Sequence, residues 1–142
     1  IILPVLNEEE NLEELYSRLE KILAKLDLEY EIIAVDDGST DNSFQILKQI
    51  HERDPGLRAI KFRRNFGQTA ALSAGFHHAK GNIIITMDSD LQNDPDDIPR
   101  LLEKINEGYD VVSGWRADRK DKFITRRLPS ILANRIIVKM TV

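Results

Sequence analysis

Cysteine is absent from this 142-residue sequence, which excludes disulfide bonds and thiolate metal sites. No apolar run approaches the roughly 20 residues that a membrane-spanning helix needs, and no signal-peptide pattern is present. We therefore expect this segment to be soluble. Two glycine motifs that cradle nucleotide phosphates, G-x-G-x-x-G and G-x-x-x-x-G-K-[ST], are also missing, because the glycines never fall at those spacings. Phosphates would have to be held by other groups.

Positive charge is scarce over most of the chain and concentrated at its end. Residues 116–142 carry eight Lys and Arg against two Asp and Glu, a balance of +6, whereas the first 115 residues carry twelve against twenty-two, a balance of −10. This asymmetry points to an anionic partner near the C-terminal end. A solvated basic helix is the alternative, and composition alone favours it.

Length and composition suit one globular α/β domain, with 42% hydrophobic and 31% charged residues. Apolar spacings typical of strands alternate with those of amphipathic helices, which predicts a mostly parallel sheet with helices on both faces. Ser39 or Thr40 is expected to cap the second helix. We expect strands at residues 1–6, 30–35, 57–62, 83–87 and 109–113, and helices at residues 8–26, 41–52, 67–79 and 96–106.

Polar side chains follow each of the expected strands. In parallel α/β sheets, ligands bind at the carboxyl ends of the strands. Here those ends read PVLNEEE, VDDGSTDN, RRNFGQ, DSDLQ and GWRADR. Carboxylates, amides and arginines would therefore converge on one edge of the sheet, which predicts a ligand site there.

Two carboxylates one residue apart, Asp88 and Asp90, follow an apolar run. In extended backbone they can point to the same side, and Gln92 continues the alternation with a neutral oxygen. Mg²⁺ and Mn²⁺ prefer oxygen ligands, and Mg²⁺ usually needs only one or two carboxylates plus substrate phosphates. A cation held here would replace the missing glycine cradle. The alternative is that both acids serve only in a turn or a helix cap.

A second acidic pair, Asp36 and Asp37, ends another expected strand. An acid at this place can accept hydrogen bonds from the base or ribose of a nucleotide. The alternative is structural, with Asp37, Gly38 and Ser39 forming a turn that caps the next helix. Both interpretations can hold for different residues, with Asp37 on the ligand and the other two in the turn.

Five stretches, in this order, resemble the family-2 glycosyltransferases of the GT-A fold: PVLNEEENL, VDDGSTDNS, RNFGQTAALSAGF, MDSDLQNDPDDIP and GYDVVSGWRADRKD. They are most similar to the branch that moves sugars from nucleotide donors onto polyprenyl phosphates, such as dolichyl-phosphate mannose synthases and bacterial undecaprenyl-phosphate sugar transferases. The resemblance implies a three-layer, Rossmann-like GT-A fold and favours a UDP-sugar donor. Leu6 departs from a commonly aromatic position, which argues against base stacking there, and Ser89 departs from a common alanine.

The resemblance also implies a role for each matching residue. The cofactor would be Mg²⁺ or Mn²⁺, held by Asp88, Asp90 and Gln92. The acids at 88 and 90 would carry catalysis together with Arg116 and Arg119. The nucleotide-sugar would be bound by Pro4, Asn7, Glu8, Asp37, Gly67, Gln68, Asp88 and Ser89.

No general base is evident, and a phosphate acceptor explains why. A phosphate is already an anion near neutral pH, so it could attack the anomeric carbon directly and invert that centre. It would need cations, and the guanidinium group of arginine suits phosphate through a bidentate fork. The expected acceptor-phosphate ligands are Arg116, Arg119, Arg126 and Arg127.

We expect a nucleotide-sugar-binding core at residues 1–115 and a basic, acceptor-side segment at residues 116–142. The latter contains a helical apolar face that would lie at a membrane interface or, alternatively, cover the sheet. The chain starts without methionine inside an expected strand and stops inside this apolar run. We therefore expect a longer parent protein that continues into transmembrane helices and associates with the cytoplasmic face of a membrane. The apolar face comprises Leu128, Ile131, Leu132, Ile136 and Met140.

Other protein classes also place paired acids after a strand. Aspartyl-phosphate phosphatases and mutases typically have Thr or Val where this chain has Gln92, and phosphate-accepting receiver domains have a different strand order. A non-catalytic sugar-nucleotide-binding module, a GDP-mannose donor and a non-lipid acceptor are further alternatives. No nucleic-acid partner is expected, and homo-oligomerisation is left open.

Overall fold

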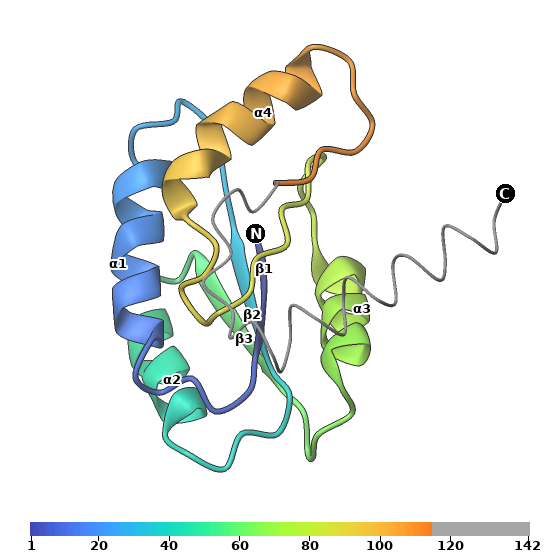
Figure 1. Cartoon of the computed structure of the whole chain (residues 1–142). Helices are drawn as coiled ribbons and strands as arrows, with labels where there is room; N and C mark the ends of the chain where they lie inside the picture. The colour runs from blue at the N-terminus through green and yellow to red at the C-terminus, as the bar shows by residue number, and fades with distance from the viewer. Residues whose placement is uncertain (115–142) are drawn as a thin grey trace, which may run out of the picture. The chain divides into compact units, whose positions relative to one another are not determined.

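The computed structural model describes residues 1–114, and Ile1–Asp110 form one compact unit. Its centre is a parallel sheet of three strands, β1 (Ile2–Val5), β2 (Ile32–Asp36) and β3 (Leu57–Lys61), in that spatial order (Figure 1). The central strand, β2, is buried at every position. Burial on both faces is expected of a strand in a parallel sheet that has helices on either side.

Helices cover both faces of the sheet (Figure 1). On one side lie α1 (Leu12–Leu23), α2 (Ser43–Arg53) and α4 (Ile98–Asn106), with the short 3₁₀ helix η1 (Pro95–Asp97) leading into α4. On the other side lies α3 (Gln68–His78). These three layers confirm the predicted α/β architecture with a parallel sheet.

The central strand contributes to two apolar clusters, because successive side chains of a strand point to opposite faces. Ile32 and Ala34 belong to the larger cluster with α1 and α2, and Val35 packs with Ala71 of α3 in the smaller one. Helix α3 approaches the sheet closely, since a Cβ added to Gly75 would lie 2.3 Å from Cγ2 of Ile2. The small residues of α3 therefore serve helix–sheet packing.

Two of the five expected strands are not formed in the part of the chain that the structure describes. Residues 83–87 make only an isolated parallel bridge to β1, between Ile2 and Thr86. Residues 109–113 have no strand pairing. Both predictions were wrong because a strand needs a hydrogen-bonding partner along its length as well as apolar residues. Beside β1, Ile84 remains 41% exposed.

Helices begin later than the apolar periodicity predicted. Helix α1 starts at Leu12 instead of residue 8, and α2 starts at Ser43. The expected cap of α2 is wrong because Ser39 has another partner: its hydroxyl accepts the N–H of Asn7, 32 residues earlier (3.0 Å). Tertiary contacts override local capping here. Within residues 1–114 no helix is long and apolar enough to cross a membrane.

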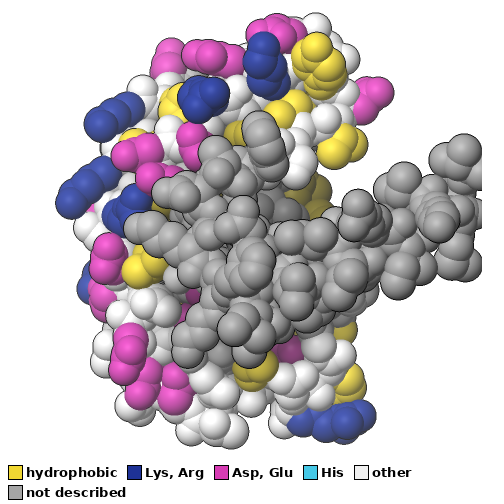
Figure 2. All heavy atoms as spheres, viewed as in Figure 1, with side chains coloured by type: hydrophobic (Ala, Val, Ile, Leu, Met, Phe, Trp, Pro, Cys, Tyr) yellow, Lys and Arg dark blue, Asp and Glu magenta, His cyan; other side chains and the backbone are white. Residues whose placement is uncertain are grey.

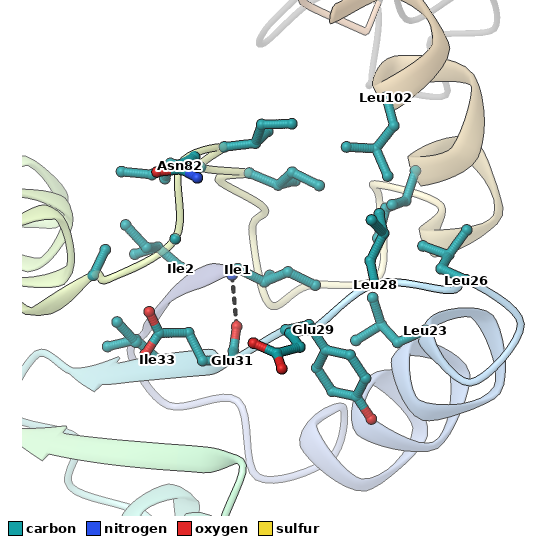
Figure 3. Close-up of a pocket in the computed structure, with 17 residues that line it drawn as sticks. Ile1, Ile2, Leu23, Leu26, Leu28, Glu29, Glu31, Ile33, Asn82 and Leu102 are labelled. Carbon is teal, nitrogen blue, oxygen red and sulfur yellow. Dashed lines mark hydrogen bonds between the residues drawn. The ribbon is translucent and has the colours of Figure 1, made fainter. Parts of the chain in front are cut away.

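An apolar cavity of about 260 Å³ lies at the amino ends of the strands (Figure 3). We call it the amino-edge cavity. Figure 3 shows leucines of α1, of the chain that follows it and of α4 on one side, and isoleucines of β1 and β2 on the other. Its principal apolar lining residues are Ile1, Ile2, Leu23, Leu26, Leu28, Ile33, Ile83, Ile84, Ile85, Ile98 and Leu102.

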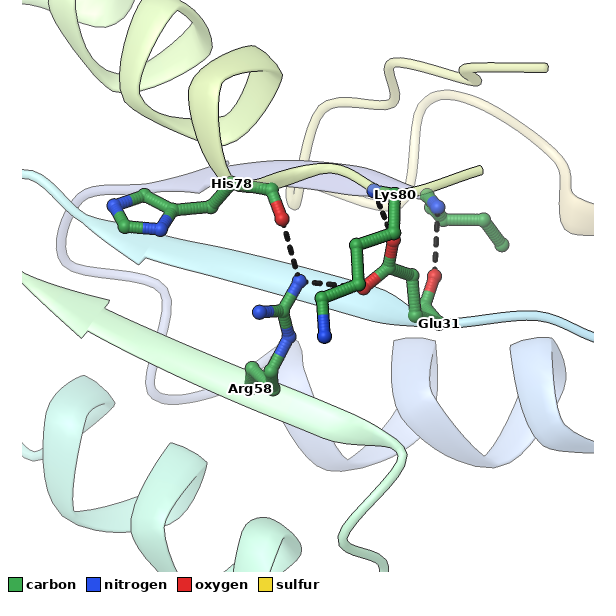
Figure 4. A network of polar contacts seen from close by, with 5 residues as sticks. Glu31, Arg58, His78 and Lys80 are labelled. Carbon is green, nitrogen blue, oxygen red and sulfur yellow. Dashed lines mark hydrogen bonds and ion pairs between the residues drawn. The ribbon is translucent and has the colours of Figure 1, made fainter. Parts of the chain in front are cut away.

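At the same edge, Glu31 joins three segments of the chain (Figure 4). One carboxylate oxygen accepts a hydrogen bond from Arg58 of β3 (2.5 Å), and the other accepts the N–H of Lys80 (2.6 Å). Arg58 also donates to the carbonyl of His78 (2.7 Å). The pKa of Glu31 is lowered from its ordinary value, chiefly by the hydrogen bond from Lys80. This network ties the start of β2 to β3 and to the end of α3.

Candidate active site

A polar cavity of about 360 Å³ opens at the carboxyl ends of β1 and β2. We call it the carboxyl-edge cavity. The loop after β1, the end of β2, the start of α3 and the DSD stretch at residues 88–90 meet there. Its lining residues are Pro4, Val5, Leu6, Glu8, Asp37, Gln68, Asp88, Ser89 and Asp90.

Most of the residues expected to bind a nucleotide-sugar line this cavity, and Asp90 lines it as well. Asn7 and Gly67 are the two that do not, although each is next to a lining residue in the sequence. Gln92, the third expected metal ligand, is not a lining residue either. The expected acceptor-phosphate ligands lie outside the described residues. These are Arg116, Arg119, Arg126 and Arg127.

Side-chain hydrogen bonds fix the DSD stretch to its neighbours. Ser89, which is 3% exposed, donates its hydroxyl to the carbonyl of Pro4 (2.9 Å). Gln68 Nε2 donates to Oδ1 of Asp88 (2.8 Å). Ser89 therefore fixes the DSD stretch to β1. Asp88 and Asp90, on either side of it, line the cavity, and Asp88 also contacts α3 through Gln68.

The extended alternation that predicted Gln92 as a ligand is interrupted before that residue, because the chain bends at residues 89–91. Leu91 has a φ of 59°, in the left-handed region that non-glycine residues rarely adopt. The chain turns there, and the backbone N–H of Gln92 donates to Oδ1 of Asp90 (3.1 Å). A metal contact from the Gln92 side chain stays a prediction.

Both carboxylate oxygens of Asp37 are used within the fold. Oδ1 accepts the N–H of Phe66 (2.7 Å), and Oδ2 accepts the N–H of Gly67 (2.9 Å). The residue is 3% exposed, and hydrogen bonds to a charged acceptor contribute about 1.5–3 kcal/mol each. Asp37 therefore holds the loop before α3, a structural role different from the cap of α2 considered for it. Contact with a nucleotide stays a prediction.

Asp36 is a buried acid to which sequence reasoning gave no role. It is fully buried, and its Oδ1 accepts the N–H of Ser39 (3.1 Å). Its Oδ2 has no hydrogen-bond partner among the described residues. A buried acceptor left unpaired costs about 1–3 kcal/mol. The two adjacent acids in the sequence indicated a polar strand end. No local sequence pattern indicates that Asp36 and Asp37 have different hydrogen-bond partners.

The loops after β1 and β2 are hydrogen-bonded to each other. Asn7 adopts the left-handed conformation (φ 55°), and its Oδ1 accepts the N–H of Thr40 (2.8 Å). The Ser43 hydroxyl accepts the N–H of Glu8 (2.8 Å). Asn7 thus contacts the neighbouring loop, while Glu8 lines the cavity. A direct contact between Asn7 and a nucleotide stays a prediction.

Among the described residues, acids but no Lys or Arg line the carboxyl-edge cavity. The carboxylates of Glu8, Asp37, Asp88 and Asp90 would repel a diphosphate. In residues 1–114 no group of three or more His, Cys, Asp or Glu side chains is placed to hold a metal ion by itself. Since Mg²⁺ needs only one or two carboxylates when substrate phosphates complete its shell, two acids fit a cation that binds together with a phosphate ligand.

Known proteins resemble the chain over nearly its whole length. Residues 1–140 match the profile of the family described as Glycosyl transferase family 2. The undecaprenyl-phosphate 4-deoxy-4-formamido-L-arabinose transferase of Edwardsiella ictaluri is 46% identical over 143 residues, which cover 99% of this chain and 43% of that protein. The chain therefore spans less than half the length of this curated relative.

Two solved structures have the same fold. Glucosyl-3-phosphoglycerate synthase from Mycobacterium tuberculosis, in complex with phosphoglyceric acid, gives a TM-score of 0.62 at 26% identity, covering 93% of this chain and 48% of that one. A mannosyltransferase from Pyrobaculum calidifontis, in complex with GDP-Man and Mn²⁺, gives 0.60 at 25% identity, covering 72% and 30%. These neighbours confirm the GT-A fold predicted from the sequence.

Proposed function

This chain belongs to glycosyl transferase family 2, and from that premise we propose that it transfers a sugar from a nucleotide-sugar to a polyprenyl phosphate, using a divalent cation. A UDP-sugar is the favoured donor. The observation that carries the proposal is the acid-lined cavity where Asp88 and Asp90 lie together at the carboxyl edge of the sheet. The name of the Edwardsiella relative supports undecaprenyl phosphate as the class of acceptor.

Asp88 and Asp90 are the residues that would hold Mg²⁺ or Mn²⁺. The mannosyltransferase complex with GDP-Man and Mn²⁺ supports a cation of this kind. When bound, the cation would neutralise charge on the departing nucleotide diphosphate. Gln68 would orient the Asp88 carboxylate through its 2.8 Å hydrogen bond, as outer-shell partners orient metal ligands in other proteins.

Pro4, Glu8 and Asp37 would line the nucleotide side of the cavity. Asp37 already accepts two backbone N–H groups, but an ionised carboxylate offers about four lone-pair sites. A ribose hydroxyl or a base N–H could therefore bond to the same carboxylate without breaking either backbone contact. Asp37 would then both hold the loop before α3 and contact the donor.

The phosphate acceptor would attack the anomeric carbon without a general base, and the transfer would invert that centre. Guanidinium groups in residues 116–142 would hold the acceptor phosphate. Because a polyprenyl chain keeps its phosphate at the bilayer surface, the whole protein would work at a membrane, with this segment on the acceptor side. The residues proposed for the acceptor are Arg116, Arg119, Arg126 and Arg127.

Transfer is tested by incubating the chain with a labelled UDP-sugar, Mn²⁺ or Mg²⁺, and a polyprenyl phosphate. Asp90→Asn should abolish labelling of the lipid, whereas Asp27→Asn, an exposed acid outside the cavity, should leave it unchanged. A parallel reaction with GDP-mannose decides between the donor classes. Labelling that persists without metal, or in Asp90→Asn, contradicts the metal role. Donor binding without any lipid product supports the non-catalytic alternative.

A further inference from the structure

The end of β3 and the loop after it, residues 61–66, carry three cations and two aromatic rings. We call this segment the basic loop. No ion pair among residues 1–114 includes Lys61, Arg63 or Arg64, although the first 115 residues carry ten more acids than bases. In Figure 2, Lys and Arg side chains project at the lower right, where Figure 1 shows the loop between β3 and α3. This positive charge is available to an anionic partner.

Aromatic rings lie among these cations. Phe66 is 47% exposed, and the guanidinium carbon of Arg64 lies 4.4 Å from the centre of its ring. The ring of Phe62 meets that of Phe66 edge-on, with 5.6 Å between the centroids. Exposed aromatic and basic side chains side by side suit the boundary between water and lipid, where rings bury and cations meet headgroups.

The basic loop is held in shape by the turn after β2. Asp37 accepts the N–H of Phe66, and Gly38 (φ +76°) approaches so closely that an added Cβ would lie 2.4 Å from the backbone carbon of Arg64. Only glycine permits this contact between the two segments. A preformed loop loses less conformational entropy when it binds a partner.

We propose that the basic loop docks on the anionic surface of a membrane, next to the carboxyl-edge cavity. Gln68 follows Phe66 by two residues and contacts Asp88 of the cavity at 2.8 Å, so the loop and the cavity are adjacent. This inference rests on the proposed function, because a bilayer at this place would present the phosphate of a polyprenyl acceptor beside the donor.

A lipid surface fits the basic loop better than a nucleic acid does. Even a small protein–DNA interface buries roughly 600–1,000 Å² of protein surface, and the first 115 residues, from which such a surface would be drawn, carry ten more acids than bases. An anionic bilayer can be touched by the tip of one loop. Each Lys or Arg near such a bilayer contributes about 1 kcal/mol, or about fivefold in binding.

The first test uses the absence of cysteine, because a single introduced cysteine can be labelled selectively. A polarity-sensitive fluorophore on Phe66→Cys should shift to the blue with phosphatidylglycerol vesicles, and the shift should fade as salt is added. The same label on Leu28→Cys, 59% exposed at the opposite edge of the sheet, is the matched control and should not shift. Phosphatidylcholine vesicles should leave both labels unshifted.

The second test measures vesicle sedimentation. Arg63→Gln with Arg64→Gln should weaken binding to phosphatidylglycerol vesicles about 25-fold, at about fivefold per cation. Lys21→Gln with Lys25→Gln, exposed near the end of α1, removes the same charge elsewhere and should leave affinity within about twofold.

Equal label shifts at residues 66 and 28 would overturn the proposal. So would an equal loss of vesicle affinity in the double arginine variant and in the double lysine variant. So would RNA binding that depends on Arg63 and Arg64 when vesicle binding does not. Failure of sugar transfer in its own assay, with the vesicle results as expected, would overturn the proposed function and leave the membrane contact standing.

Discussion

The cavities at the two edges of the sheet differ in the charge of the side chains that line them. At the carboxyl edge, acids line the cavity without a basic residue among the described lining residues. At the amino edge, the cavity is apolar, and the nearby carboxylate of Glu31 is paired with Arg58 and a backbone N–H. A cavity lined by acids and by no basic residue suits a cationic ligand, whereas the ion pair of Glu31 with Arg58 serves the fold. We therefore propose ligand binding at the carboxyl edge and a role in stability for the amino edge.

The largest expected effect comes from removing an acid at the carboxyl edge. Asp88→Asn or Asp90→Asn should lower Mn²⁺-dependent affinity for UDP at least about 100-fold, because even outer-shell partners of metal ligands cost about 10–100-fold. Calorimetric titration with and without Mn²⁺ measures this, and urea unfolding should show nearly unchanged stability. If both variants keep the metal-dependent affinity, the metal assignment is wrong.

Asp37 does not fit a simple division between the two edges, since it lines the carboxyl-edge cavity but also holds the loop before α3. Asp37→Ala should lower the free energy of unfolding by about 3 kcal/mol, because the N–H groups of Phe66 and Gly67 lose a charged acceptor. Urea unfolding gives the stability, and titration of UDP and a UDP-sugar gives the affinities. Equal weakening of both ligands, with stability retained, would show that the carboxylate acts on the nucleotide and not on the loop.

Gln68→Ala sharpens the assignment of the carboxyl edge to ligand binding. Without the hydrogen bond to Oδ1 of Asp88, metal-dependent UDP affinity should fall about tenfold, with stability nearly unchanged. Thr69→Ala, one residue further along α3 and exposed, is the matched control and should bind UDP as the parent does. Titration of UDP in the presence of Mn²⁺ and in the presence of a chelator separates metal-dependent from metal-independent binding. A loss that is the same in chelator would place Gln68 on the nucleotide instead.

The smallest expected effect lies at the amino edge and depends on pH. The folded-state pKa of Glu31 is lowered, so its contribution to stability is present above the ordinary value of 4.5 and is lost as pH falls through the folded pKa. Glu31→Gln should cost at most about 1 kcal/mol near neutral pH, because the pair with Arg58 is partly exposed.

Urea unfolding at several pH values below neutrality measures this difference. The stabilities of the parent and Glu31→Gln should converge as the acid is protonated, and UDP affinity should not differ between them. Glu10→Gln, an exposed acid outside the network, serves as the control. A gap that widens on acidification would contradict the assigned direction of the pKa change.

Much of the carboxyl edge was predictable because the ends of parallel strands meet there whatever their sequence. Glu8, Asp88 and Asp90 were expected at this edge from the polar strand ends together with the family resemblance, and they line the cavity although residues 83–87 form only one bridge. Their hydrogen-bond partners were not predictable in the same way. Asp37 bonds residues 29 and 30 positions later, and no local pattern in VDDGSTDN indicates them. Local propensity also could not show that Leu91 would turn the chain before Gln92.

The strand at residues 83–87 fails for a related reason. Its apolar residues satisfy the composition of a strand, but pairing is a property of two segments, and only Ile2 and Thr86 form a bridge in the described structure. The basic segment at residues 116–142, including Arg116 and Arg119, lies outside the described residues, so its roles rest on sequence. What local patterns predicted well was the order of elements, and what they missed was long-range pairing.

The hydrogen bond from Ser89 to the carbonyl of Pro4 sets an order of events during biosynthesis. Its two ends are 85 residues apart. At about 5–20 residues per second, a ribosome needs roughly 4–17 s after making Pro4 before it adds the serine. Strand β1 is complete one residue after Pro4, and β2 and β3 are synthesised in that interval, so the sheet can assemble first. The side of the cavity that carries Asp88 and Asp90 closes only when the DSD stretch has emerged, so the candidate active site is completed after the three-stranded sheet.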